Sequence, residues 1–529
     1  MSSIGNTTTF LLLVGSALLP LLFVYYRQKS EEEERDESNN DIKKAEAHFK
    51  EQYRTVLVRA SRDGNLGLVS ELLKHKEVDV NVLDAYGQAP LITAVVNGHL
   101  GIVCELLKHK EVDVNAQDDN GRTPLIIACS KGRLDIVCEL LKRKEVNVNA
   151  QCKNGRTSLI CASVYDYLGI VSVLLKLKDV DVNAQDNNGR TSLIIACAMG
   201  RLDIVGVLLN HKEVNVNAQC KHGRTPLVSA IHDCQVGVVS ELLKHSEVDM
   251  NLSDNNGRTP LIVACSRSNG SSQIDLAIVC QLLKHKEVDA NMRDKEGRTP
   301  LIAACSNRFG PRSDIDLAIV RALLKHEGVD ANMRDNEGRT ALIAACTPQV
   351  SSYFMRISAT NEMNLDIARE LLKHKGVDVN IRDNDGRALL IIACSSGRLD
   401  IVCELLKHEE VDVNLGDEKG RTAFYLASVE ERWEMLLEFL KHDKVDVNVQ
   451  GPHGNTALIW ATLRGRLDVV CELLDDVRVD VRIRNKAGST AVDIARKCNL
   501  FEIASCLEEH SKVRLRDEWE ATYFDKMRN

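Results

Sequence analysis

Thiols are the side chains of this sequence best suited to chemistry, because a cysteine can serve as a nucleophile or as a metal ligand. The chain has 17 cysteines, and the stretch from Gly121 to Lys142 alone holds Cys129 and Cys138 beside the carboxylate of Asp135. No two cysteines have the C-x-x-C spacing of zinc ribbons and thioredoxin-like sites. So many cysteines without such a motif favour a reducing compartment over a disulfide-bonded, secreted protein.

The stretch around Cys129 is repeated, which changes the interpretation of its thiols. The tripeptide Gly-Arg-Thr returns at intervals of 34 residues, at Gly121, Gly155 and Gly189, in a series of about 13 units over residues 49–511. A catalytic or metal site is normally built once, whereas a structural unit is repeated. We therefore interpret the thiols as small packing groups, and we predict no catalytic residue, no metal ligand and no cofactor. Two rows of equivalent cysteines share this interpretation: Cys129, Cys197, Cys265, Cys305, Cys346 and Cys394 in the first, and Cys104, Cys138, Cys403 and Cys471 in the second.

Each unit has the pattern of two short helices followed by an extended finger. Thr123 before Pro124 supplies an N-cap oxygen and a proline at the first helical position, and a short apolar helix then runs to Ser130. The apolar residues from Leu134 to Leu141 have helical spacing and predict a second, amphipathic helix. A histidine follows this helix in most units, and we interpret it as a cap at the negative end of the helix dipole. The alternating valines and asparagines after it predict a β-hairpin-like finger.

Neither helix can bury its apolar face alone, so neighbouring units must stack. The predicted fold class is an all-α repeat solenoid of stacked helix-turn-helix units with β-hairpin-like fingers. This pattern resembles the ankyrin repeat over most of the chain, in Asp118 to Leu125, Gly132, Leu140-Leu141 and Asp113 to Asn115. One departure is Ile126, which stands where that family usually has a histidine bonded to the threonine. The resemblance implies protein binding through the finger tips and the first helices, which form a concave surface in that family.

A separate apolar segment precedes the repeats. Residues 10–26 contain no charged residue, and their number is at the short end of what spans a bilayer. Arg27 and Lys29 lie only on the C-terminal side, so the positive-inside bias predicts a single-pass signal-anchor helix with the repeats facing the cytoplasm. The alternative is a cleaved signal, although no lysine or arginine precedes the run and no small-x-small cleavage site follows it. The predicted organisation is a short N-terminal segment at 1–9, the transmembrane helix at 10–26, a charged linker at 27–48, the repeat array at 49–511 and a tail at 512–529.

Composition and motifs exclude several classes of function. The sequence has no P-loop, G-x-S-x-G, kinase motif set or H-E-x-x-H. The net charge of -8 lacks the basic excess of most nucleic-acid binders, and an arginine such as Arg122 shares its finger with an acid such as Asp118, which screens it. We therefore expect a non-enzymatic, membrane-anchored scaffold with protein partners, no nucleic acid and no small-molecule substrate. The alternative is a soluble or secreted adaptor that regulates a separate enzyme or signalling partner.

Specific recognition is expected where the units differ. Gly257, Gly297, Gly338 and Gly386 are 40, 41 and 48 residues apart, and the extra residues fall between the two helices of their units, near 266–273, 306–313 and 347–364. Stacked units place equivalent loops side by side, so these insertions predict one protein-binding patch rich in aromatic and arginine side chains. The alternative is that exposed loops tolerate insertions without any function. The predicted patch contains Arg267, Arg308, Phe309, Arg312, Tyr353, Phe354, Met355 and Arg356.

Overall fold

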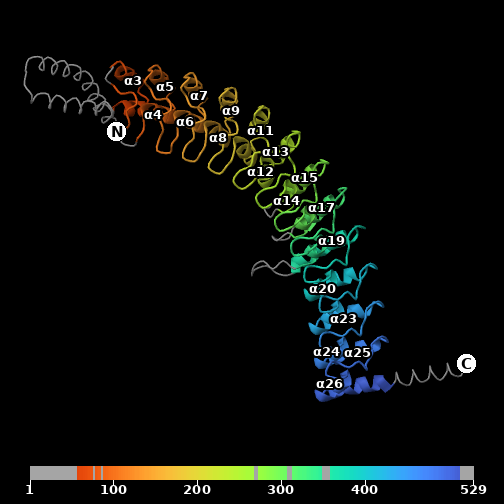
Figure 1. The fold of residues 1–529 in the computed structure, drawn as a ribbon. Helices are drawn as coiled ribbons and strands as arrows, with labels where there is room; N and C mark the ends of the chain where they lie inside the picture. The colour runs from red at the N-terminus through yellow and green to blue at the C-terminus, as the bar shows by residue number, and fades with distance from the viewer. Residues whose placement is uncertain are drawn as a thin grey trace, which may run out of the picture. The chain divides into compact units, whose positions relative to one another are not determined.

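The computed structural model of this protein describes the backbone of residues 56–75, 78–84, 87–266, 272–306, 313–347 and 358–512, and the side chains of these ranges except at 272, 313 and 358–364. The described residues form pairs of short helices joined by turns (Figure 1). The chain divides into two compact units, one ending at Asn187 and the other beginning at Asn188.

The first compact unit is a stack of helix pairs in which each helix packs against its counterpart in the next pair. The first helices α4, α6 and α8 contact one another in order, and so do the second helices α3, α5, α7 and α9. The helices of this unit are residues 56–63, α3 (Leu66–Leu72), α4 (Pro90–Asn97), α5 (Leu100–Leu107), α6 (Pro124–Lys131), α7 (Leu134–Leu140), α8 (Ser158–Val164) and α9 (Leu168–Leu174).

The second compact unit repeats the same packing. Its earlier pairs are α10 (Ser192–Ala198) with α11 (Leu202–Leu209), α12 (Pro226–His232) with α13 (Val236–Leu242), α14 (Pro260–Cys265) with α15 (Ser272–Leu282), α16 (Pro300–Cys305) with α17 (Ser313–Leu324) and α18 (Ala341–Cys346) with α19 (Ser358–Leu372). Its later pairs are α20 (Leu389–Ser395) with α21 (Leu399–Leu405), α22 (Ala423–Val429) with α23 (Trp433–Leu440), α24 (Ala457–Leu463) with α25 (Leu467–Asp475) and α26 (Ala491–Lys497) with the helical residues 501–512.

The first helix of each pair is apolar on all sides because it lies between its own second helix and the first helices of its neighbours. In α6 every residue from Pro124 to Cys129 is buried. The hydroxyl oxygen of Thr123 accepts a hydrogen bond from the backbone N–H of Ile126 at 3.3 Å, which satisfies one of the free donors at the helix start. Gly132 ends the helix in the left-handed conformation, with φ 72°.

The second helix of each pair is amphipathic. In α7 the side chains of Ile136, Val137 and Leu140 are buried, whereas Glu139 forms an exposed ion pair with Lys142 at 2.6 Å. The units with insertions have long second helices: α15 has 11 residues, α17 has 12 and α19 has 15, against seven in α7 and nine in α25. The inserted residues therefore partly extend the second helix at its N-terminal end, where the sequence predicted loops.

The expected β-hairpin-like fingers are tight turns, and the described residues contain no β-strand. In one finger the N–H of Asp118 donates to the carbonyl of Arg122 at 3.1 Å, and a single backbone bond of 2.9 Å from Lys153 to Asn120 joins this finger to the next. One such bond per pair of fingers is too little for a strand ladder. The one isolated β-bridge in the described ranges joins Arg382 and Ala388.

The predicted transmembrane helix lies at residues 10–26, outside the described ranges. Within those ranges, no helix combines the length and the apolar composition that crossing a membrane requires.

Candidate functional site

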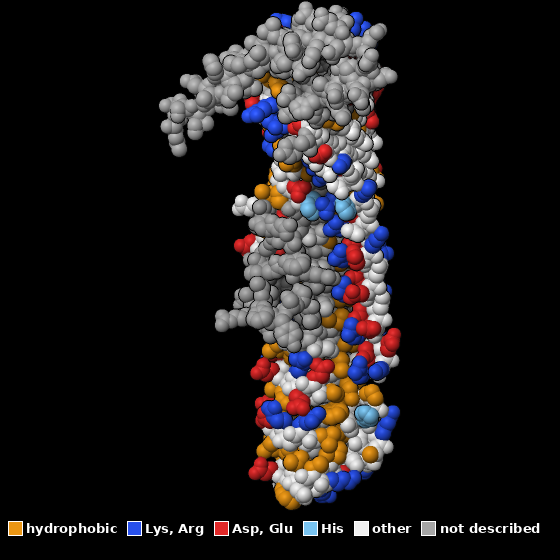
Figure 2. Space-filling view, turned by 90° about the vertical axis from the view of Figure 1, so that its left-hand side faces the viewer, with side chains coloured by type: hydrophobic (Ala, Val, Ile, Leu, Met, Phe, Trp, Pro, Cys, Tyr) orange, Lys and Arg blue, Asp and Glu red, His pale blue; other side chains and the backbone are white. Residues whose placement is uncertain are grey.

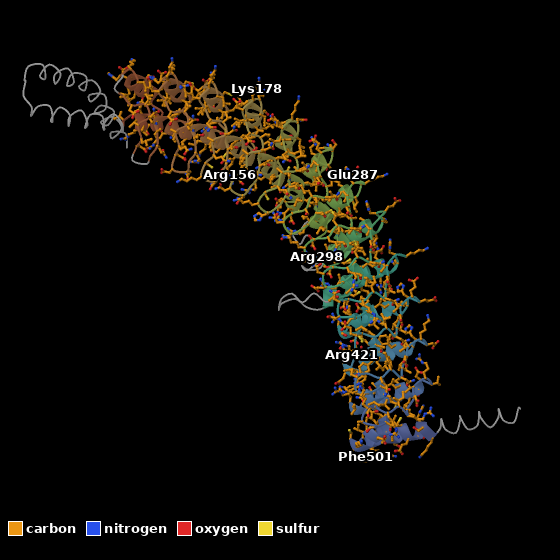
Figure 3. The ribbon with its side chains drawn as sticks, viewed as in Figure 1. Arg156, Lys178, Glu287, Arg298, Arg421 and Phe501 are labelled. Atoms are coloured by element: carbon orange, nitrogen blue, oxygen red, sulfur yellow. The ribbon has the colours of Figure 1, made fainter. Side chains whose placement is uncertain are left out.

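The fingers form a row along one side of each stack, opposite to the turns that follow the second helices. In the first compact unit Arg156 of a finger and Lys178 of such a turn lie on opposite sides (Figure 3). In the second, Arg298 and Arg421 lie on the finger side and Glu287 lies on the other (Figure 3). We call the surface that carries the fingers the finger side. Figure 2 shows basic and acidic side chains next to one another along an edge of this side, beside a band of hydrophobic side chains.

Each regular finger is built around one buried carboxylate. In the finger from Asp118 to Arg122, oxygen Oδ1 of Asp118 accepts hydrogen bonds from the backbone N–H groups of Asn120 at 2.9 Å and Arg122 at 2.8 Å. The other oxygen, Oδ2, accepts from the guanidinium of Arg122, with Nε at 2.8 Å and Nη2 at 2.7 Å. One carboxylate thus holds two backbone donors and a bidentate cation, an arrangement that we call the Asp–Arg clamp.

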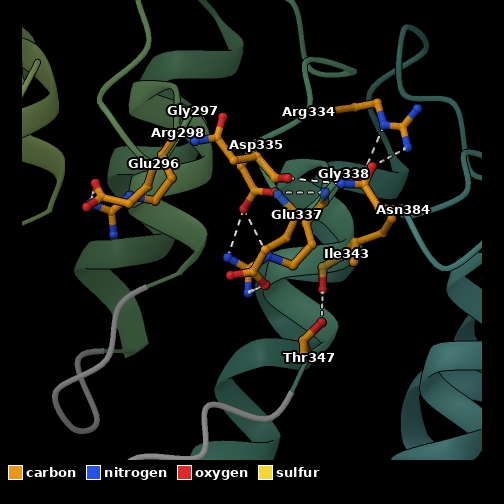
Figure 4. Close-up of polar contacts among 12 residues, drawn as sticks. Glu296, Gly297, Arg298, Arg334, Asp335, Glu337, Gly338, Ile343, Thr347 and Asn384 are labelled. Atoms are coloured by element: carbon orange, nitrogen blue, oxygen red, sulfur yellow. Dashed lines mark hydrogen bonds and ion pairs between the residues drawn. The ribbon is translucent and has the colours of Figure 1, made fainter.

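The same clamp recurs in both compact units, and it confirms the predicted pairing of arginine and aspartate within a finger. Asp335 pairs with Arg339 at 2.8 Å, and its side chain is only 1 % exposed; Figure 4 shows the dashed contacts of Asp335. In the finger of Asp417, burial acts to raise the pKa of the carboxyl, but the hydrogen bonds from Arg421 and Lys419 outweigh it and the pKa is lowered. Examples of clamps with an ion pair are Asp118–Arg122, Asp254–Arg258, Asp294–Arg298, Asp335–Arg339, Asp383–Arg387 and Asp417–Arg421.

Hydrogen bonds between neighbouring fingers hold the row in place. The guanidinium of Arg293 donates to the carbonyl of Arg334 in the next finger at 2.7 Å, and Arg334 donates to the carbonyl of Arg382 in the one after, also at 2.7 Å. The amide of Asn336 donates to the carbonyl of Lys295 in the preceding finger at 2.8 Å. The tips of these fingers are therefore exposed but fixed in position.

A second set of contacts, which we call the asparagine ladder, links the units at the base of the fingers. The side-chain amide of Asn291 donates to the carbonyl of Gly328 at 2.6 Å, and its oxygen accepts from the backbone N–H of Asp330 at 2.9 Å. Sequence reasoning missed this ladder, although the asparagine that recurs in each finger was a visible signal. The same pair of bonds is made by Asn81, Asn115, Asn149, Asn217, Asn251, Asn332, Asn380, Asn414 and Asn448.

The packing interpretation of the cysteines is right for the first row. All six members are buried, and burial raises the pKa of their thiols, to about 12 for Cys346 and Cys394. A thiol that does not ionise near neutral pH is a poor nucleophile. These residues therefore fill space in the first helices.

The same interpretation is wrong for the second row. Cys138 and Cys471 are exposed, and Cys104 and Cys403 are half-buried, because this position of the second helix lies beside the buried stripe and not within it. The Sγ atom of Cys471 lies 3.8 Å from that of Cys506 on the helix of residues 501–512. The described residues contain no group of three or more His, Cys, Asp or Glu side chains arranged to hold a metal ion.

The histidines at the ends of the second helices make local contacts. In the turns after α11 and α19, Nδ1 of His211 and of His374 accepts a backbone N–H from two residues further on, each at 3.4 Å. They bond to the chain that follows the helix, and not to the last helical carbonyls as the sequence suggested.

The predicted patch itself lies outside the described residues, since all eight of its members fall in the gaps at 267–271, 307–312 and 348–357. The residues just before these gaps, Ser266, Ser306 and Thr347, follow α14, α16 and α18, which pack side by side. The hydroxyl of Thr347 donates to the carbonyl of Ile343 at 2.7 Å, where the chain leaves α18 (Figure 4). The three insertions therefore begin at neighbouring positions.

Comparison with known proteins agrees with this architecture. The family model for ankyrin repeats in three copies matches residues 32–118, 102–186, 174–254, 213–277, 237–315, 268–351 and 354–451, and the model for many copies matches residues 440–495. Among solved structures, the ankyrin repeat domain of Bcl-3, a member of the IkappaB protein family, is 27% identical; the match covers 43% of this chain and 97% of that one, with a TM-score of 0.38. No curated protein matches the sequence. Because the family models cover most of its length, this chain belongs to the ankyrin-repeat family.

Proposed function

We propose that this chain is a non-enzymatic scaffold that binds other proteins through the finger side of its repeats and the inserted loops, and that residues 10–26 anchor it to a membrane with the repeats in the cytoplasm. The binding of other proteins rests on the family, because ankyrin repeats imply a protein-interaction scaffold. The anchoring, the orientation and the role of the loops rest on the sequence.

The observation that carries the binding proposal is the fixed row of fingers. Each tip is exposed, yet the clamps and the bonds from Arg293, Arg334 and Asn336 hold it against its neighbours. A surface that is ordered before it meets its partner loses little conformational entropy on binding. The clamps also neutralise most of the charge of the row, so that specificity must come from the positions where the units differ.

The inserted loops are the first of these positions. The residues before the three insertions lie at neighbouring helix ends, and the insertions bring aromatic and arginine side chains, which are enriched at binding hot spots. Arg267, Arg308, Phe309, Arg312, Tyr353, Phe354, Met355 and Arg356 remain the predicted contact residues.

Affinity capture with the full-length chain tests the binding proposal. Proteins that copurify with the wild type would be compared with those captured by a variant in which Tyr353→Ala and Phe354→Ala are combined. A matched comparison replaces the exposed tip residues Asn120 and Asn256 of regular fingers by Ala, which leaves the clamps intact. We expect the loop variant to lose the partner and this comparison variant to weaken its capture much less. Retention by the loop variant with loss in the comparison variant would move the site to the regular fingers.

Protease treatment of sealed membrane vesicles tests the anchoring proposal. The repeats should sediment with the membrane and should be digested from outside vesicles that have their cytoplasmic face outward. A soluble chain whose N-terminus begins after residue 26 would instead support an adaptor released by cleavage of a signal, and repeats protected inside the vesicles would reverse the orientation.

A further inference from the structure

Two fingers keep the arginine of the clamp but lack its aspartate. Cys152 takes the place of the aspartate in the finger that ends at Arg156, and Cys220 takes it in the finger that ends at Arg224. We call these two the cysteine fingers. One lies in each compact unit, and the contacts described below for each finger lie within its own unit.

The backbone of a cysteine finger has the same turn as that of a regular finger. The N–H of Cys220 donates to the carbonyl of Arg224 at 3.1 Å, and the N–H of Gly223 donates to the carbonyl of Cys220 at 2.8 Å. The corresponding bonds in the next finger, at Asp254 and Arg258, are 3.0 and 2.8 Å. The loss of the carboxylate has therefore not changed the geometry of the donors that surround it elsewhere.

Those donors lose their acceptor in the cysteine fingers. In the neighbouring regular finger, Asp254 accepts hydrogen bonds from the backbone N–H groups of Asn256 and Arg258. It also accepts from Nε and Nη2 of the Arg258 guanidinium. Over the described part of the chain, no carboxylate lies within ion-pair distance of Arg224, and no side chain accepts from the N–H of His222 or Arg224. The thiol of Cys220 belongs instead to a buried apolar cluster with two neighbours, Ile194 and Ala218.

The cysteine finger of the first compact unit repeats this arrangement. The N–H of Cys152 donates to the carbonyl of Arg156 at 3.1 Å, and the N–H of Gly155 donates to the carbonyl of Cys152 at 2.7 Å. Over the described part of that unit, neither the guanidinium of Arg156 nor the N–H groups of Asn154 and Arg156 have a carboxylate partner. Both cysteine fingers thus keep the donors of a clamp but lack its carboxylate.

Two other irregular fingers show how this chain replaces the clamp where no ligand is needed. In one, Gly451 replaces the aspartate and Asn455 replaces the arginine, so that the cation is removed together with the acid. In the other, the side-chain oxygen of Asn485 accepts from the N–H groups of Ala487 and Ser489, each at 3.0 Å. The cysteine fingers follow neither course, since they retain a cation and two donors.

The surroundings of the cysteine fingers are basic and ordered. Lys153 and Lys221 are exposed, in place of the acidic or neutral residues at this position of most regular fingers, and His222 is exposed beside Lys221. The N–H of Lys221 donates to the carbonyl of Asn188 at 2.9 Å, and the amide of Asn255 donates to the carbonyl of Lys221 at 2.8 Å. The donors are therefore held in position from both sides before any ligand arrives.

We propose that each cysteine finger binds a carboxylate from an acidic segment of a protein partner, which takes the place of the missing aspartate. The incoming carboxylate accepts from two backbone N–H groups and from the half-buried guanidinium of Arg156 or Arg224, and the lysine of the finger adds a second positive charge. This site deepens the proposed scaffold function and rests on it. It also gives a role to these two arginines, whose fingers lack the clamp aspartate.

Binding of a fluorescein-labelled oligoglutamate peptide to the full-length protein, followed by fluorescence anisotropy at low salt, tests this proposal. The double substitution of Cys152→Asp with Cys220→Asp supplies an internal carboxylate to each finger and should weaken binding roughly tenfold, as should Arg156→Gln with Arg224→Gln. Cys152→Ala with Cys220→Ala leaves the donors free and should preserve the affinity. A charge control, Lys178→Gln with Lys212→Gln, removes two exposed cations from the turns after α9 and α11 and should have a much smaller effect.

The thermal unfolding temperature, measured without any ligand, is a second test of the proposal. Because Cys220→Asp provides the acceptor that the finger lacks, it should raise the thermal unfolding temperature, whereas Cys220→Ala should not. A fall in that temperature with Cys220→Asp, or equal weakening of peptide binding by the aspartate variants and the charge control, would overturn the proposal. Tighter binding of inorganic phosphate or single-stranded RNA than of the peptide, with the same dependence on the variants, would overturn the assignment to a carboxylate. Partner capture that survives the aspartate variants would refute this site and leave the scaffold function standing.

Discussion

The phenol ring of Tyr425 occupies the space that a side chain at Gly451 would need. A Cβ added at Gly451 would overlap the ring and hydroxyl of Tyr425, which is itself only 3 % exposed. Tyr425 stands where most other units have an isoleucine, and Gly451 stands where regular fingers have the clamp aspartate. One large side chain in a first helix therefore accompanies the loss of the clamp in the finger that follows it.

This relationship predicts that Gly451→Ala lowers the stability of the neighbouring repeats by about 1–3 kcal/mol, the usual cost of overpacking. Urea unfolding followed by the fluorescence of Trp433 and Trp460 measures it, because both tryptophans lie in adjacent helix pairs. Combining Gly451→Ala with Tyr425→Ile should relieve part of the loss. Gly206→Ala is the control, since a Cβ there meets nothing within 4 Å, and a helical alanine should be neutral or stabilising. Equal destabilisation by both substitutions would contradict the steric argument.

The asparagine ladder predicts that Asn291→Ala destabilises the stack by about 1–2 kcal/mol, because it removes a donor to Gly328 and an acceptor for the N–H of Asp330. Hydrogen exchange should show lost protection of the Asp330 amide in particular. Asn256→Ala is a suitable control, because the structure gives the exposed side chain of Asn256 no hydrogen bond. Unchanged protection at Asp330 would mean that the ladder bond does not persist in solution.

The two rows of cysteines should differ in their reactivity towards a thiol reagent. In the folded protein the exposed Cys138 and Cys471 should be alkylated first, while Cys197 and Cys346 should react only on unfolding, because they are buried. Mass spectrometry of peptides after a timed pulse of iodoacetamide measures the order. Replacing Cys197 by Ala should cost little, since the cavity left by one sulfur atom is small. Alkylation of Cys197 as fast as Cys138 in the native protein would contradict the packing interpretation.

The buried thiols also predict that stability falls in alkaline solution. The pKa of Cys346 and Cys394 is raised to about 12 in the folded chain, against about 8.5 for an exposed cysteine. Their contribution to stability is fully present below about pH 8.5, and it is lost as the pH rises towards 12, because the unfolded chain releases these protons first. Urea unfolding midpoints between pH 7 and pH 10 should decrease in the wild type. The decrease should be smaller when Cys346 and Cys394 are both replaced by Ala, and an equal decrease would contradict this account.

Shortening the longest insertion should separate folding from binding. Replacing residues 347–364 by the four residues found at Ser130–Arg133 leaves the buried side chains of Ile367 and Leu371 in place. Loop length affects stability only weakly, and units of a repeat protein contact mainly their neighbours, so circular dichroism and the unfolding midpoint should change little. If the loops form the binding patch, partner capture should fall at least about fivefold, which corresponds to roughly 1 kcal/mol. Unchanged capture would remove the loops from the site.

The sequence by itself determined the repeat fold, because each element of a unit depends on residues close to one another in the chain. Thr123 and Pro124 start a helix through contacts within one turn, and the clamp of Asp118 and Arg122 joins residues four positions apart. The 34-residue period then implies stacking, since no single unit can bury its apolar faces. The family and the in-finger ion pairs could therefore be predicted without coordinates.

Only the tertiary structure decided the features that depend on contacts between units. The bond from Asn291 to Gly328 spans 37 residues, and the overlap of Tyr425 with Gly451 joins a helix to the following finger. The exposure of Cys138 depends on how far its helix is covered by its neighbours, which helical periodicity does not specify. The lack of a carboxylate partner for Arg156 and Arg224 likewise emerges from comparing turns that make the same backbone hydrogen bonds. A repeated sequence specifies its unit through local interactions, whereas the differences between units acquire a meaning only when stacking brings them against other residues.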